Sequence, residues 1–230
     1  MRILAVIAAR GGSKRLPGKN IRVLGGRPLL AWSVQAARGI DDICDILLST
    51  DDHDVARVGK DSGALVPWLR PAELATDAAS SVDVCLHALD RYEADRGAVD
   101  AILLLQPTSP FRKRTSVLHG IELFKQDPSR PVVSVSPAAS HPQWCFRLEQ
   151  GTLRPFLDSN GLNLRSQDLT PAYVINGAFY LIEAARLREQ RSLLGDEMVP
   201  LLMESPAERI DIDSESDWQA AESMLAAWRP

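Results

Sequence analysis

The sequence lacks an apolar run long enough to cross a membrane, and it contains few cysteines. Cys44, Cys85 and Cys145 lie far apart, no two of them form a CxxC pair, and their odd number argues against a disulfide framework. The apolar residues 3–9 are too few for a membrane helix, and no small-residue cleavage site follows them. These absences predict a protein of the reducing cytoplasm that has no membrane partner.

An excess of charge of one sign is also missing. The chain has 26 Lys and Arg against 30 Asp and Glu, a formal net charge of −4, which disfavours a nucleic-acid partner or a general anion binder. Any anion must therefore be held by a local cluster of cations. With 230 residues and a hydrophobic fraction of 45%, the composition favours a single globular domain over residues 1–230.

Apolar runs typical of buried strands alternate with segments of helical periodicity. The expected strands are residues 3–9, 45–50, 101–105, 132–136, 178–182 and 209–213. The expected helices are residues 29–38, 54–62, the segment after Ser80, 116–126, and a last segment in which Trp218, Ala221 and Leu225 face inward. This alternation predicts βαβ units and an α/β fold with a mostly parallel sheet. Residues 137–172 carry four prolines and no long periodic segment, so we expect an excursion from the core.

A glycine-rich, cationic loop follows the first strand. Residues 9–20 contain three glycines and four Lys or Arg side chains. Glycines let backbone N–H groups approach an anion, and the cations add fixed charge, so this loop is suited to hold a polyphosphate. Its spacing matches neither G-x-G-x-x-G nor G-x-x-x-x-G-K-[ST]. A solvated turn is the alternative, but the charge density and the position after a parallel strand favour a binding loop.

Two aspartates form a candidate metal pair near the end of the chain. In an extended segment Asp211 and Asp213 point to one side, about 6.5–7 Å apart, while Ile210 and Ile212 point to the other. Two such carboxylates can converge on Mg²⁺, which would bridge the phosphates of a nucleotide. The following residues 214–217 have the pattern of a helix capping box, which accounts for Glu215 and Asp217 without a metal.

Five segments together carry a family resemblance. They are residues 8–14 with Lys19 and Asn20, residues 69–75 with 79–81, residues 105–110, residues 176–180, and residues 210–213. Taken in this order, they resemble the N-acylneuraminate cytidylyltransferases, also called CMP-sialic acid synthetases. The resemblance implies a Rossmann-like nucleotidyltransferase core, a small dimerisation insert at residues 138–172, and a homodimer. It also implies CTP and an acidic nine-carbon sugar as substrates.

The same resemblance implies a role for each matching residue. The triphosphate would be held by Arg10, Ser13, Lys14 and Lys19, and the cytidine by Asn20, Arg70 and Ser81. The sugar pocket would be lined by Gln106, Arg165, Asn176 and Tyr180, with the Arg165 guanidinium as the partner of the sugar carboxylate. Asp211 and Asp213 would carry Mg²⁺. The catalytic set would be Arg10, Lys14, Lys19 and Asp211, with Asp211 as the base that deprotonates the anomeric hydroxyl.

The implied reaction is transfer of CMP from CTP to the anomeric hydroxyl of N-acetylneuraminic acid, with release of pyrophosphate. Some family members that use sialic acid have a lysine in the segment that corresponds to residues 140–144, whereas this chain has none and carries Trp144 there. Legionaminic acid, pseudaminic acid and the eight-carbon acid KDO are therefore alternative substrates. A non-catalytic nucleotide-binding module is the alternative from another class.

Overall fold

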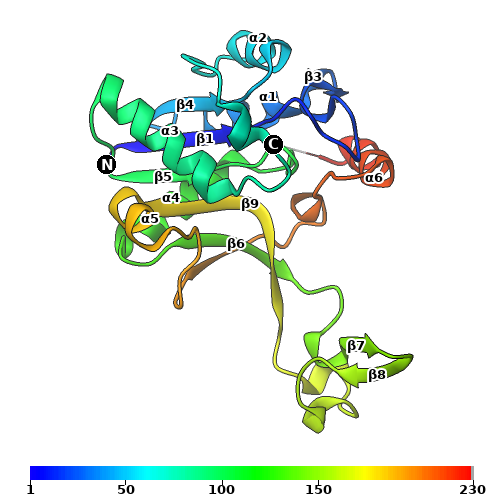
Figure 1. The fold of residues 1–230 in the computed structure, drawn as a ribbon. Helices are drawn as coiled ribbons and strands as arrows, with labels where there is room; N and C mark the ends of the chain where they lie inside the picture. Colours follow the sequence, from blue (N-terminus) through cyan, green and yellow to red (C-terminus); the bar gives the residue numbers. More distant parts are fainter. Residues whose placement is uncertain (229–230) are drawn as a thin grey trace.

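A six-stranded sheet with the order β10-β6-β9-β5-β1-β4 forms the centre of the molecule (Figure 1). The computed structural model describes residues 1–228. The strands of this sheet are β1 (Ile3–Ala8), β4 (Ile43–Ser49), β5 (Ala101–Leu104), β6 (Val132–Pro137), β9 (Tyr173–Glu183) and β10 (Val199–Leu202). Strand β1 pairs in parallel with β4 and β5, and β6 pairs in parallel with β10, whereas β9 is antiparallel to both of its neighbours. The predicted mostly parallel sheet is confirmed.

Helices cover both faces of the sheet. They are α1 (Leu29–Ala37), α2 (His53–Asp61), α3 (Ser81–Arg96), α4 (Arg114–Gln126), α5 (Ala184–Gln190) and α6 (Glu215–Leu225). Helices α1 and α4 pack on one face, and α3 and α5 pack on the other. Within residues 1–228, no helix combines the length and the apolar character that crossing a bilayer requires.

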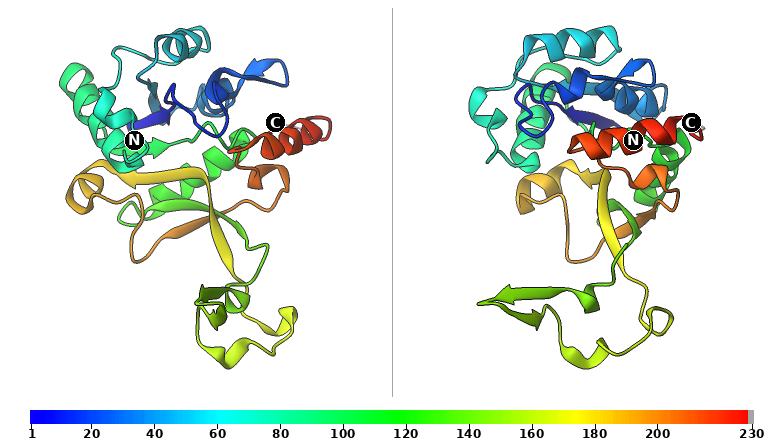
Figure 2. Two further views of the ribbon diagram at one scale, coloured as in Figure 1. Left: turned by 45° about the vertical axis from the view of Figure 1, so that its right-hand side comes forward. Right: turned by 90° about the vertical axis from the view of Figure 1, so that its right-hand side faces the viewer.

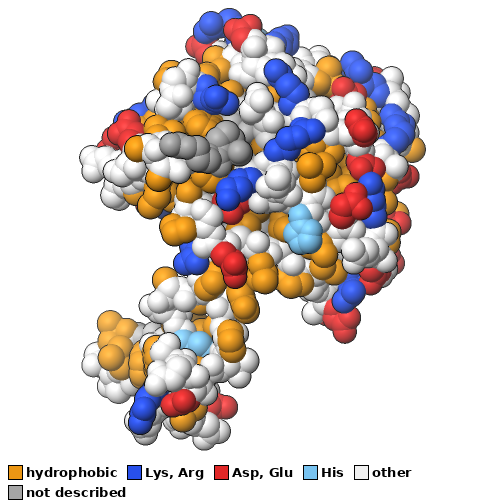
Figure 3. Space-filling model, turned by 180° about the vertical axis from the view of Figure 1, so that it is seen from behind, with side chains coloured by type: hydrophobic (Ala, Val, Ile, Leu, Met, Phe, Trp, Pro, Cys, Tyr) orange, Lys and Arg blue, Asp and Glu red, His pale blue; other side chains and the backbone are white. Residues whose placement is uncertain are grey.

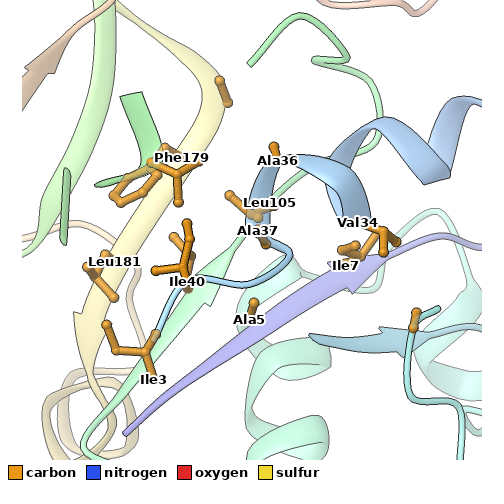
Figure 4. Close-up of a cluster of buried hydrophobic side chains, with 14 of the residues drawn as sticks. Ile3, Ala5, Ile7, Val34, Ala36, Ala37, Ile40, Leu105, Phe179 and Leu181 are labelled. Carbon is orange, nitrogen blue, oxygen red and sulfur yellow. The ribbon is translucent and has the colours of Figure 1, made fainter. Parts of the chain in front are cut away.

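The side chains of β1 show why the sheet is buried on both faces. Ile3, Ala5 and Ile7 point into a cluster with side chains of α1 and β9, as the close-up in Figure 4 shows. Leu4 and Val6 point into the opposite cluster, with side chains of α3 and β5. A strand that is apolar at every position therefore has an apolar partner on either side, as expected of a central parallel strand.

A third apolar cluster lies beyond the carboxyl ends of the parallel strands. It joins the N-terminal loop to α6 through buried residues that include Leu16, Phe111, Ile212 and Trp218. The capping box expected at α6 is present, because Ser214 accepts a hydrogen bond from the backbone of Asp217 and Asp217 accepts one in return. The small strands β2 (Val23–Leu24) and β3 (Arg27–Pro28) form a tight hairpin beside this cluster.

Residues 138–172 leave the sheet and form a projecting arm. Both views in Figure 2 show the ends of β6 and β9 running out of the body towards this arm. Its regular structure is a hairpin of β7 (Phe146–Glu149) and β8 (Thr152–Pro155), with short 3₁₀ turns on either side. The sequence predicts the excursion but not the hairpin inside it.

Candidate active site

The glycine-rich loop leaves the end of β1 and turns beside the end of β4. The Gly11 N–H donates a hydrogen bond to Asp51 Oδ1 at 3.1 Å. A Cβ atom at Gly11 would lie 2.6 Å from Asp52 Oδ2, so any larger residue would push the loop away from β4. The glycine therefore allows the close approach that fixes this loop at the carboxyl edge of the sheet, where parallel α/β proteins bind ligands.

This loop forms one wall of a pocket of about 480 Å³. The pocket is lined by Arg10, Ser13, Lys14, Arg15, Leu16, Lys19, Asn20, Asp77, Thr108 and Asp213. Four of these side chains are cationic, which makes the pocket a strong local attractor for a polyanion in a protein whose net charge is negative. The five loop residues expected around a nucleotide, Arg10, Ser13, Lys14, Lys19 and Asn20, all face it.

A carboxylate already pairs with two of the cations. Asp77 lies 2.7 Å from Arg10 Nη2 and also forms an ion pair with Lys14. These two partners donate hydrogen bonds that hold the pKa of Asp77 below the ordinary value of an aspartate. The carboxylate of Asp77 therefore occupies the place beside Arg10 and Lys14 where an anionic ligand would bind.

Lys19 joins the loop to the late carboxylates. The side chain is almost completely buried, and its Nζ donates to the Ile212 carbonyl at 2.6 Å and to Asp213 Oδ1 at 2.8 Å. Arg15 reaches the other oxygen of Asp213 at 3.2 Å. The N-terminal cations and the C-terminal aspartate therefore belong to one pocket, although nearly the whole chain separates them.

The expected strand at residues 209–213 is wrong. Residues Ala207–Arg209 form a 3₁₀ helix, and the chain that follows is extended without pairing in a sheet. One backbone hydrogen bond, from Ile212 N–H to the Thr108 carbonyl at 2.8 Å, holds it in place. Ile210 and Ile212 nevertheless pack into the third apolar cluster, so the alternation of side chains persists without a strand ladder.

A second pocket, of about 430 Å³, is also lined by residues of this segment. It is lined by Gln106, Ser136, Pro137, Ala139, Val174, Ile175, Asn176, Gly177, Tyr180, Arg209 and Asp211. Three of the four residues expected to contact a sugar, Gln106, Asn176 and Tyr180, therefore come together. The Asn176 amide is fixed in orientation because it donates to Ser136 Oγ at 2.9 Å and accepts from Ser134.

The two aspartates and Thr108 connect the linings of the two pockets, because Asp211 of the second pocket is hydrogen-bonded to Thr108 of the first. Asp213 faces the cationic pocket and Asp211 faces the second one. Desolvation raises the pKa of Asp211 above the ordinary value of an aspartate, and the nearby Asp213 raises it further, while a hydrogen bond with Thr108 and the charge of Lys19 oppose the shift. Desolvation also raises the pKa of Tyr180, with a contribution from Asp211.

Comparison with known proteins identifies the family. The family model for cytidylyltransferases matches residues 4–150, which is more than half of the chain. The chain belongs to the cytidylyltransferase family.

Relatives with assigned activities resemble this cytidylyltransferase over most of its length. It is 41% identical over 227 residues to the CMP-N,N'-diacetyllegionaminic acid synthase of Legionella pneumophila, a match that covers 98% of this chain and 97% of the relative. It is 33% identical over 180 residues to the pseudaminic acid cytidylyltransferase of Campylobacter jejuni, with 78% of each chain covered. It is 30% identical over 221 residues to the N-acylneuraminate cytidylyltransferase of Escherichia coli, covering 96% of this chain and 51% of the relative.

A solved structure confirms the fold. The CMP:2-keto-3-deoxy-manno-octonic acid synthetase complexed with CTP superposes with a TM-score of 0.73, and 99% of each chain is covered. The sequence identity is only 15%, so this likeness concerns the arrangement of the elements. The expected Rossmann-like nucleotidyltransferase core is therefore correct.

Arg70 and Ser81, which were expected around the cytidine, line neither of the two pockets within the described residues 1–228. Arg70 is buried beyond the loop, 3.8 Å from Asp51 Oδ1, and burial lowers the pKa of its guanidinium. Its Nε is buried and makes no hydrogen bond within the described part of the chain. Because Asp51 also accepts the Gly11 N–H, it links Arg70 to the glycine-rich loop. Ser81 is exposed at the start of α3.

Arg165 was also expected to contact the sugar, but it does not line the second pocket. It lies on the projecting arm next to the 3₁₀ turn Ser166–Asp168, and it is exposed. The cation that does line this pocket is Arg209.

The aspartate pair fits a magnesium ion that arrives with a nucleotide. Mg²⁺ is commonly held by one or two carboxylates together with phosphate oxygens and water. Asp211 and Asp213 are two such carboxylates, and because both oxygens of Asp213 are paired with Lys19 and Arg15, Mg²⁺ would have to share or replace one of these contacts. Among residues 1–228 there is no group of three or more acidic, His or Cys side chains that could form an all-protein metal cage.

Proposed function

We propose that this cytidylyltransferase transfers CMP from CTP to the anomeric hydroxyl of an N,N'-diacetyllegionaminic-type acid and releases pyrophosphate. The observation that carries this proposal is that Asp211 and Asp213, two residues apart, line two different pockets. The pocket of Asp213 is rich in cations, and the pocket of Asp211 is rich in hydrogen-bonding groups. A triphosphate in the first and a sugar acid in the second would meet at these carboxylates.

The choice of sugar differs from N-acetylneuraminic acid, the first expectation from sequence. The relatives support the legionaminic alternative better, because the legionaminic relative is 41% identical over nearly the whole of both chains and the N-acylneuraminate relative is 30% identical. The second pocket adds a physical reason. Pro137, Ala139, Val174 and Ile175 give it an apolar wall that suits the methyl groups of two acetamido substituents.

The residues divide the work of the reaction between them. Arg10, Ser13 and Lys14 bind the phosphates, while buried Lys19 also holds Asp213 and the backbone of Ile212 in place. Asn20 lines the cationic pocket on the cytidine's side, and Arg70 and Ser81, which lie outside both pockets, stay the predicted further contacts of the cytidine. Gln106, Asn176 and Tyr180 orient the sugar. When bound by Asp211 and Asp213, Mg²⁺ supplies charge neutralisation for the phosphates.

The chemical step is an in-line displacement at the α-phosphorus of CTP. The anomeric oxygen forms the new bond to phosphorus, the bond to the bridging oxygen breaks, and pyrophosphate leaves with that electron pair. Asp211, the carboxylate that lines the sugar pocket, accepts the proton of the hydroxyl. Positioning and neutralisation of phosphate charge account for most of the rate enhancement.

The proposal is tested with CTP, Mg²⁺ and a panel of sugar acids. Pyrophosphate release and mass spectrometry of the CMP-linked product are measured with diacetyllegionaminic, pseudaminic and N-acetylneuraminic acids and with KDO. We expect the highest kcat/KM with diacetyllegionaminic acid. Asp211→Asn should lower kcat by about 10²–10⁴-fold, the usual contribution of a general base. The matched control is Glu215→Gln, because Glu215 belongs to the same region but pairs with Arg22 at the surface.

Other outcomes would change the assignment in defined ways. If the enzyme prefers another acid of the panel, that acid is the substrate, and the proposed reaction type is unchanged. Binding of CTP without pyrophosphate release for every acid would instead identify a non-catalytic nucleotide-binding module.

We also propose that the enzyme acts in the cytoplasm as a homodimer joined through the arm. Leu148 and Leu153, which pair across the hairpin, are 72% and 63% exposed, and Phe156 and Leu157 beside them are exposed as well. Apolar side chains appear on the surface of the arm in Figure 3. Such a surface is typical of a protein contact. Contact between Arg165 and a sugar would then require the arm of a second copy.

A further inference from the structure

The sugar pocket contains a guanidinium that no carboxylate of residues 1–228 neutralises. Of the described residues that line the pocket, Arg209 alone is cationic. Its Nη2 donates to the Glu204 carbonyl at 2.9 Å, and within residues 1–228 the guanidinium has no carboxylate partner and no further hydrogen bond. A guanidinium has five N–H donors in a planar fork, so most of its capacity is directed to solvent or to a ligand.

The backbone places this side chain beside the candidate base. Ile210 is extended, with φ −71° and ψ 122°, and it packs towards the third apolar cluster. Residues on either side of an extended residue point the same way and are roughly 6.5–7 Å apart. Arg209 and Asp211 therefore enter the same pocket as neighbours, which agrees with the residues that line it.

The chemistry of the proposed substrate matches this pair. In a 2-keto sugar acid, the carboxylate carbon is bonded directly to the anomeric carbon that carries the attacking hydroxyl. A substrate whose hydroxyl lies against Asp211 therefore brings its carboxylate to the adjacent side chain. Guanidinium groups bind carboxylates through two parallel hydrogen bonds, which fixes orientation as well as position.

We infer that Arg209 binds the carboxylate of the sugar acid and so orients the anomeric hydroxyl towards Asp211. This inference rests on the proposed function and replaces Arg165 by Arg209 as the carboxylate partner within one chain. Three of the other polar residues of the pocket, Gln106, Asn176 and Tyr180, then contact the hydroxyl and acetamido groups.

The test compares the sugar acid with its carboxamide in four enzymes: wild type, Arg209→Gln, Arg209→Lys and Arg165→Gln. For wild type we expect the amide to have a KM about ten- to a hundredfold higher, the factor that a hydrogen bond to a charged group supplies. Arg209→Gln should raise the KM for the acid by a similar factor and treat the acid and the amide alike. Arg209→Lys should recover part of the preference, and the KM for CTP should change in neither variant.

The outcomes separate the inference from the function on which it rests. An Arg209→Gln enzyme that still prefers the acid by the wild-type factor overturns the inference. If Arg165→Gln abolishes the preference instead, the arm supplies the carboxylate partner. If the wild type releases no pyrophosphate, the proposed function is overturned. The preference for the acid over the amide is then measured by calorimetry, as the ratio of their dissociation constants. Unchanged thermal unfolding of the variants excludes a folding defect.

Discussion

At the scale of single residues, Gly177 leaves room for the side chain of Gln106, a proposed contact of the sugar. It has a φ of +79°, and a Cβ atom there would lie 2.6 Å from Gln106 Oε1. We predict that Gly177→Ala destabilises the protein by about 1–3 kcal/mol because of backbone strain. It should also raise the KM for the sugar acid, because the flexible end of Gln106 must move out of the way. Denaturant unfolding and steady-state kinetics measure the two effects.

Gly26 provides a matched control for this substitution. Its φ is +82°, and a Cβ atom would meet nothing within 4 Å. Gly26→Ala should therefore cost a similar free energy of unfolding and leave the sugar KM unchanged. If both variants bind the sugar acid as wild type does, Gly177 has no role in positioning Gln106.

The sequence identifies residues of the site where the signal is local. The cations and glycines of residues 10–20 stand close together in the chain, and the structure gathers the expected ones around a single pocket. Asp77 and Arg209 carry no comparable signal. Asp77 reaches the loop only because the chain before α3 folds back over it, and Arg209 differs from other surface arginines only in the pocket it faces.

At the scale of secondary structure, the segment at residues 207–213 shows where periodicity is ambiguous. Alternating polar and apolar residues predict a strand, but the alternation requires only an extended chain with one buried side. Here the apolar side packs against α6 and the N-terminal loop, so its side chains are buried without pairing to a neighbouring strand. The side-chain directions were therefore predictable and the backbone pairing was not. The antiparallel direction of β9 was hidden for a similar reason, since it depends on the path of the arm.

The segment between Arg70 and α3 should act as an internal competitor of the nucleotide. Asp77 pairs with Arg10 and Lys14, so a triphosphate must displace its carboxylate before it can use both cations. We predict that Asp77→Asn lowers the KM for CTP by about three- to tenfold, consistent with two exposed ion pairs of 0–1 kcal/mol each. The effect should shrink at high salt because the pairs are exposed.

Asp95→Asn is the control for the change in net charge. Asp95 is exposed near the end of α3 and forms no ion pair among the described residues. Its substitution should leave the KM for CTP within about twofold of wild type, since distant surface charges are screened. An equal effect of the two substitutions would mean that net charge, and not the contact of Asp77 with the loop, governs CTP binding.

At the scale of the whole molecule, the body of the fold could be predicted and the arm could not. Apolar runs and helical periodicity report burial within one chain, and they give five of the six strands of the central sheet and all the described α-helices except α5, while β10 was not expected. The arm consists of residues 138–172, whose apolar side chains find few partners in their own chain. Sequence patterns do not distinguish a residue buried by its own chain from one buried by another copy.

The last prediction concerns the assembly of two chains. Leu148 and Leu153 lie opposite each other on one face of the hairpin, so Leu148→Glu with Leu153→Glu places two charges in the centre of the proposed contact. We expect light scattering to give twice 25.2 kDa for wild type and 25.2 kDa for this variant. Thr152→Glu, on the opposite face of the hairpin, should remain a dimer. A wild type that has the mass of one chain at micromolar concentration would contradict the proposed homodimer, because burying this apolar surface should hold two copies together under those conditions.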